Sequence, residues 1–128
     1  MSDENVETVR SSLDAIDRGD AETALSFFSE DVVFEPLVAG PYYGHAGVVA
    51  QWMAFFEEFD DYWFEADELI DAGEEVVLYW RHGGIGKASG IRVENEGGSV
   101  FTFKDGKISR VRVYADRAES LKVAGLWE

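Results

Sequence analysis

The feature that most constrains the fold of this chain is a change in the spacing of its apolar residues near position 60. Before this point, apolar side chains recur every three or four residues, which is the spacing of one face of an α-helix. This spacing predicts three helices, over 2–19, 20–28 and 45–59. After it, apolar and polar residues alternate as they do on a β-strand, and turn motifs such as DAGE and KDGK separate the strands.

Helices followed by strands predict an α+β fold, in which the helices pack on one face of a bent, mainly antiparallel sheet. Strands are expected over 31–36, 62–70, 75–82, 91–103 and 108–115, with glycines interrupting the fourth at 97–98. A short helix over 116–128 closes the chain. A helical layer on a curved sheet leaves a cavity at its open end, which is where we expect a ligand.

Length and charge exclude several classes of function. The 128 residues predict one domain spanning 1–128. With 26 acids against 11 bases the net charge is −15, which disfavours nucleic acids and anionic membranes as partners. The chain has no cysteine and starts with an acidic, polar segment, so we expect a cytoplasmic protein. A halophilic source and an ordinary acidic bacterial protein explain this charge equally well.

Four segments, in this order, resemble the SnoaL-like branch of the nuclear transport factor two-like (ketosteroid isomerase-like) superfamily. They are RGDAETALSFFSEDVVFEP, YYGHAGV, DAGEEVVLYWR and FKDGKISRVRVYADRAESLKVAGL. The resemblance implies a cone-shaped roll of three N-terminal helices on a strongly curved sheet, with a deep apolar pocket. It also implies a homodimer formed through the sheet. The superfamily contains isomerases, epoxide hydrolases, polyketide cyclases and binding domains without catalytic activity, so the fold does not fix the function.

The resemblance places one carboxylate where ketosteroid isomerases keep their general base. Glu35 stands directly before Pro36 at the end of an apolar strand, and it replaces the aspartate of those enzymes. Their two oxyanion donors fall on Ser12 and Ser99. Hydroxyls are weaker donors than the tyrosine and acid they replace, so steroid isomerisation is not expected.

The resemblance to limonene-epoxide hydrolases is less complete. Their arginine is kept as Arg81, but the positions of their two aspartates fall on Gly83 and Val113. The acid of the polyketide cyclases also falls near Val113. The chemistry of either class therefore cannot be assigned from these residues.

Period-two counting places Tyr79 and Arg81 on one strand face, and Ser99 and Phe101 on one face of the next strand. With these faces turned inward, Glu35 and Arg81 form a buried acid–base pair in one pocket. Such a pair is either catalytic, with Glu35 as base and Arg81 as an oxyanion partner, or only structural. The predicted ligand-binding residues are Tyr79, Ser99, Phe101, Val113 and Trp52.

The two histidines and Asp116 are expected to have other roles. His82 is expected on the strand face opposite Arg81, towards a dimer interface, and His45 in an exposed loop. Asp116 begins the motif DRAE, a capping box, and is expected to cap the last helix. Two distant histidines do not make a metal motif, and neither a metal nor a cofactor is predicted.

The sequence therefore predicts a pocket protein for a hydrophobic or carboxylate-bearing small molecule. It is either a cofactor-independent isomerase, hydratase, hydrolase or cyclase with a pocket carboxylate, or a dimeric module of the same fold without catalysis.

Overall fold

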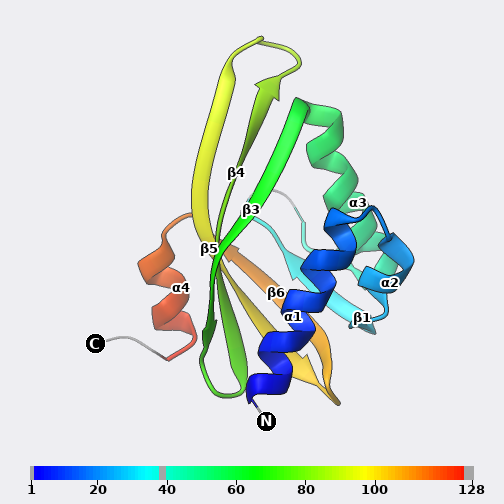
Figure 1. Ribbon diagram of the computed structural model, residues 1–128, viewed down its shortest axis with the longest axis vertical. Helices are drawn as coiled ribbons and strands as arrows, with labels where there is room; N and C mark the ends of the chain where they lie inside the picture. Colours follow the sequence, from blue (N-terminus) through cyan, green and yellow to red (C-terminus); the bar gives the residue numbers. More distant parts are fainter. Residues whose placement is uncertain (1, 38–39, 126–128) are drawn as a thin grey trace.

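The computed structural model describes residues 2–37 and 40–125 (Figure 1). Its helices are α1 (Ser2–Asp17), α2 (Ala21–Leu25), α3 (Gly44–Glu58) and α4 (Arg117–Val123). Its strands are β1 (Phe28–Glu35), β2 (Tyr42–Tyr43), β3 (Phe59–Asp71), β4 (Glu75–Gly86), β5 (Arg92–Lys104) and β6 (Lys107–Tyr114). The predicted α+β fold is confirmed. The predicted helical residues 126–128 lie outside the described part of the chain.

The strands form one curved, mixed sheet in the order β2-β1-β6-β5-β4-β3. β3 to β6 are antiparallel neighbours in chain order, whereas β1 runs parallel to β6. Neither this parallel pair nor the two-residue strand β2 was predicted, because short strands and distant pairings leave no periodic signal. The long strand β5 is continuous through its two glycines, as its unbroken register with β4 shows.

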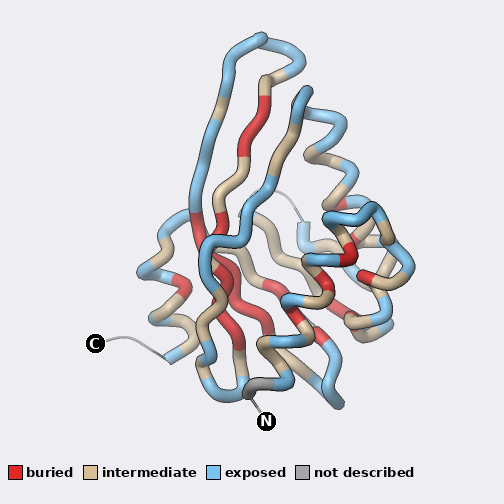
Figure 2. The backbone as a smooth tube through the Cα atoms, viewed as in Figure 1, coloured by how far each residue is buried: buried red, intermediate tan, exposed pale blue. Residues whose placement is uncertain are grey.

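The two faces of the sheet are covered by different helices. α1 and α3 pack on one face, called here the inner face, and α4 packs on the other, the outer face (Figure 1). Figure 2 shows the buried residues gathered along the middle strands and the helix sides that meet them. No helix in the described residues is long and apolar enough to cross a membrane.

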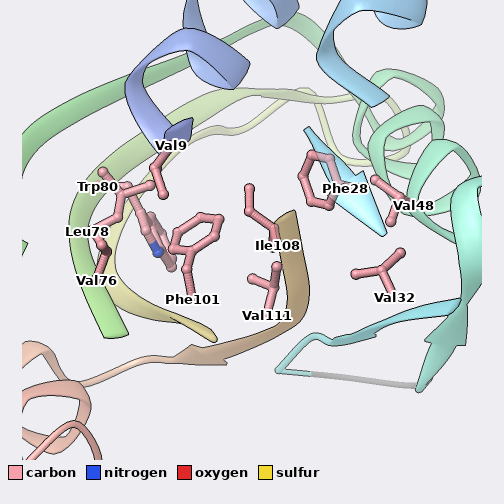
Figure 3. Packing of buried hydrophobic residues seen from close by; sticks show 10 residues of the cluster. All are labelled: Val9, Phe28, Val32, Val48, Val76, Leu78, Trp80, Phe101, Ile108 and Val111. Atoms are coloured by element: carbon pink, nitrogen blue, oxygen red, sulfur yellow. The ribbon is translucent and has the colours of Figure 1, made fainter. Parts of the chain in front are cut away.

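The main core lies between the inner face and α1 and α3 (Figure 3). Its buried members are Val9, Phe28, Val32, Val48, Val76, Leu78, Trp80, Phe101, Ile108 and Val111. These residues fix the phase of β1, β4, β5 and β6, because side chains alternate between the two faces. The core residues of β4 have even numbers. Even-numbered residues of β4 therefore point to the inner face, and odd-numbered residues point to the outer face.

α4 is held against the outer face at a glycine. A Cβ on Gly98 would lie 2.9 Å from Ser120 Cβ, so the missing side chain lets the helix approach the strand. Val77 and Val100 are also fully buried, although neither belongs to the main core. Asp116 caps α4 as predicted, since its side chain accepts a hydrogen bond from the Ala118 N–H at 2.8 Å.

Candidate functional site

Glu35 lies on the outer face, away from the core. Its neighbour Phe34 pairs with the core residue Val111, so Glu35 takes the opposite face with its strand partner Arg112. Its carboxylate accepts hydrogen bonds from Arg110, at 2.9 Å from Nε and 3.2 Å from Nη2. Both side chains are partly exposed, and Glu35 raises the pKa of the Arg110 guanidinium by this hydrogen bond.

Arg81 also lies on the outer face, and its partner is not Glu35. Its Nε donates to Asp67 at 2.8 Å, and its Nη2 lies 3.4 Å from Glu65. The hydrogen bonds from Arg81, with Arg117 second, lower the pKa of Asp67 to about 2. The predicted buried Glu35–Arg81 pair is therefore wrong. The catalytic roles assigned to the two residues stay predictions.

The cause of this error is the phase of β4. Counting correctly placed Tyr79 and Arg81 on one face, but Leu78 and Trp80, on the other face, form the more apolar set and turn inward. Tyr79 is therefore outward too, and the Arg117 guanidinium lies 4.9 Å from its ring centre. Arg117 also donates to the Trp80 carbonyl at 3.0 Å and so holds α4 to the sheet.

The other predicted ligand-binding residues do lie on the inner side. Ser99 and Phe101 are buried there, and Val113 packs against the core. The Ser99 Oγ accepts a hydrogen bond from Trp80 Nε1 at 2.9 Å. Trp52 of α3 packs edge-on against Phe28, with ring centres 6.1 Å apart. Contact with a ligand stays a prediction for each of them.

His82 points to the inner face, which contradicts its predicted place at a dimer interface. It follows Trp80 by two residues, and the two rings meet edge-on at 5.0 Å. Its Nδ1 is hydrogen-bonded to Tyr62 Oη at 2.9 Å. Phe55 of α3 stacks on Tyr62 at 5.3 Å and meets His82 edge-on at 5.2 Å. Within the described residues, no group is hydrogen-bonded to the other ring nitrogen of His82, Nε2.

The surroundings keep both members of this pair neutral near pH 7. Burial lowers the pKa of His82, although the charge of Glu58 acts in the opposite direction. Burial raises the pKa of the Tyr62 phenol. Either the Tyr62 hydroxyl donates to Nδ1 and Nε2 carries the imidazole proton, or Nδ1–H donates to the phenol oxygen and Nε2 is an acceptor. A neutral imidazole with one free nitrogen is able to transfer a proton.

Other polar groups inside the roll come from the helices. Ser12 of α1 is 2 % exposed, and its Oγ has no hydrogen-bond partner in the described part of the chain. Gln51 of α3 is 7 % exposed and lies one helical turn from Phe55. His45 is not in an exposed loop: it is half-buried in the first turn of α3, and its Nε2 donates to the Phe28 carbonyl at 2.9 Å.

Two shallow depressions lie elsewhere on the surface. One, of about 380 Å³, borders Glu75, Thr102 and Phe103, and one of about 310 Å³ lies between α1 and β3. The predicted deep apolar pocket stays a prediction. Among residues 2–37 and 40–125 no three histidine or acidic side chains are grouped as metal ligands.

Sequence reasoning missed Tyr62 as a site residue. A signal was present, since the two aromatic stretches YWF and YWRH lie on adjacent strands and each places a ring at alternate positions. The register pairs Phe64 with His82, and Tyr62, two residues earlier on the same face, reaches the imidazole beside a bulge between Asp60 and Trp63. Bulges of this kind leave no periodic trace in a sequence.

Comparison with known proteins supports the fold. An NTF2-like protein from Burkholderia thailandensis is 25% identical, with a TM-score of 0.81 and 95% of each chain covered. One from Burkholderia pseudomallei is 23% identical, with a TM-score of 0.77 and coverage of 94% of this chain and 97% of that one. TerC, co-crystallised with polyporic acid, is 20% identical, with a TM-score of 0.75 and 95% and 98% covered.

Comparison with curated protein sequences gave no match. The SnoaL-like domain family matches residues 9–111, from the core-facing turn of α1 to the middle of β6. This family supports a small-molecule pocket protein of this fold. Since the match covers most of the chain, the protein belongs to the SnoaL-like domain family.

Proposed function

We propose that this protein binds a small molecule on the inner face of its sheet and moves a proton with His82, without a cofactor. The observation that carries the proposal is the 2.9 Å hydrogen bond between Tyr62 Oη and His82 Nδ1. Rings from α3, β3 and β4 contact this pair, so a bound ligand would meet a partly buried imidazole held between rings. The arrangement supports the cofactor-independent isomerase, hydratase or cyclase that the sequence suggests, with an imidazole in place of a carboxylate.

The mechanism follows from the tautomer of His82. With the proton on Nδ1, His82 donates to Tyr62 Oη, and Nε2 keeps a lone pair. Nε2 then accepts a proton from an acidic C–H of the ligand, and the ligand becomes an enolate. The same nitrogen returns the proton to another atom of the enolate, which completes an isomerisation. In a ring closure the enolate carbon first attacks a carbonyl carbon of the same ligand, and Nε2 returns the proton to the alkoxide that forms. Because the phenol stays protonated, Tyr62 orients the imidazole and does not compete for the proton.

The test is hydrogen–deuterium exchange at the α-carbon of 2-tetralone in D₂O, followed by proton NMR. We expect the protein to accelerate exchange above the buffer rate, and His82→Gln to abolish this acceleration. Tyr62→Phe should reduce it, because the imidazole loses its orienting partner. Glu35→Gln is the matched control, since Glu35 lies on the outer face with Arg110. Exchange that survives His82→Gln but not Glu35→Gln would overturn the proposal and restore the carboxylate as base.

A second candidate is the dimeric module without catalysis. The observation that favours it is the row of half-exposed charges on the outer face, where Arg110 and Arg81 keep 46% and 37% of their side-chain surface exposed. In a dimer, these side chains would contact a second copy of the chain. Sedimentation equilibrium at micromolar concentration tests it, and a monomer would contradict both the module and the predicted homodimer.

A further inference from the structure

Five aromatic rings form a continuous row through the proposed site. Successive ring centres are 5.5 Å apart for Phe56 and Tyr62, 5.6 Å for Tyr62 and His82, 5.0 Å for His82 and Trp80, and 6.4 Å for Trp80 and Phe64. The two end rings are exposed, Phe56 by 53% and Phe64 by 41%. The row therefore runs from solvent, past the imidazole, and back to solvent. It lies where the end of α3 meets the start of β3 (Figure 1).

Four acidic residues, called here the acidic rim, flank Phe56 and Tyr62 at one end of this aromatic row. Glu57 and Glu58 follow Phe56 in the chain, and Asp60 and Asp61 precede Tyr62, all with exposed side chains. The charge that acts on His82 is that of Glu58. Such a rim gives the site a negative potential, which the net charge of −15 reinforces.

The row has no cation of its own. Within the described part of the chain, the one guanidinium or ammonium held over a ring is Arg117 over Tyr79, on the outer face. Arg81 and Arg110 are also on that face, in ion pairs with carboxylates. The Lys87 N–H donates to the Glu58 carbonyl at 3.1 Å, but the Lys87 side chain is exposed on the hairpin turn.

From these observations we propose that the ligand of this site is an organic cation, an aromatic or alicyclic body that carries an ammonium group. Ring faces attract a cation through their quadrupole, and the exposed end rings, Phe56 and Phe64, have no cation of the described residues over them. The acidic rim adds attraction for the ammonium and repels a carboxylate. The inference rests on the proposed function, because it names the ligand of the same site. It also replaces the predicted carboxylate-bearing ligand, which depended on an inward Arg81.

The ammonium has a specific partner if it carries a hydrogen. His82 Nε2 accepts this hydrogen when the imidazole proton lies on Nδ1, towards Tyr62. Proton transfer needs the same lone pair, so Nε2 either holds the ammonium of a bound ligand or takes a C–H proton, and does not do both at once.

The test compares three probes with the same ring system, 2-naphthylmethylamine, 2-naphthalenemethanol and 2-naphthoate, at pH 7. Dissociation constants come from tryptophan fluorescence, and NMR shifts of His82 locate the binding. We expect the ammonium to bind at least ~10-fold more tightly than the carboxylate, with the alcohol between them and the gap narrowing in 0.5 M salt as screening increases.

Two variants test whether the ring faces cause the preference for the ammonium probe. Phe64→Leu keeps an apolar side chain without a ring face, so the advantage of the ammonium over the alcohol should shrink. Tyr79→Leu makes the same change on the outer face and should leave both affinities unchanged. If 2-naphthoate binds most tightly at His82, the cation inference is wrong while the proposed binding site stands. If no probe shifts His82, the proposed function itself is overturned.

Discussion

The assignment of sheet faces can be tested by two substitutions on one strand. Leu78 is 2% exposed inside the core, whereas Arg81 on the other face has 37% of its side chain exposed. Leu78→Ala removes three buried carbon atoms, worth ~2.4 kcal/mol at about 0.8 kcal/mol each, and adds the cost of a cavity. We expect a loss of about 3 kcal/mol in the free energy of unfolding, and a fall in melting temperature of roughly 10 °C. Arg81→Ala removes a surface ion pair and should cost a small fraction of this.

The measurement is urea denaturation followed by tryptophan fluorescence, with the denaturant slope unchanged between variants so that the midpoints are comparable. The opposite phase of β4 predicts the opposite order. If Arg81 were buried with Glu35, breaking the pair would cost about 3–5 kcal/mol, because a charge would be left unpaired in the interior. A loss for Arg81→Ala equal to or larger than that for Leu78→Ala would refute the placement of both residues, and with it the case for His82.

Four further results are expected. The pKa of His82, followed by NMR titration, should lie below 6.5, and Glu58→Gln should lower it further by removing an attractive charge. Because the pKa of His82 is lower in the folded chain, the unfolded chain binds this proton at a higher pH. The free energy of unfolding should therefore fall as pH falls below 6.5, and His82→Gln should remove this contribution. The stability from Asp67 should be complete above about pH 4 and lost as pH falls to about 2, and Asp67→Asn should remove this dependence. Gly98→Ala should cost about 1–3 kcal/mol in unfolding free energy because its Cβ meets Ser120, and a cost that Ser120→Gly does not reduce would contradict that contact.

Local spacing was enough to predict the classes of element and most of their positions. The helical stripes of α1 and α3 were predicted because their apolar residues repeat at the helical period. The cap of α4 was predicted because Asp116 is followed by a helical pattern. The helix predicted over 20–28 ends at Leu25, and Phe28 already belongs to β1, since a short apolar run fits either structure.

The candidate site depended on information that spacing does not contain. Alternation correctly separated Arg81 from His82, but it does not say which face of a strand is covered. Three apolar residues on one face of β4, Val76, Leu78 and Trp80, against a mixture on the other face were the better guide. Resemblance to related enzymes directed attention to Glu35, and its actual partner, Arg110, lies 75 residues later in the chain. Pairings over such distances are set by the whole fold.

The parallel pairing of β1 with β6 also determines the order in which this protein can assemble. β3 to β6 follow one another with short turns, so their contacts form between chain neighbours as each strand is completed. β1 can pair with β6 only after β6 has been synthesised, when Val111 becomes available to pair with Phe34. During synthesis α1, β1 and α3 leave the ribosome long before β6, and the core lacks Ile108 and Val111 in that interval. This is the period in which the nascent chain is most exposed to aggregation.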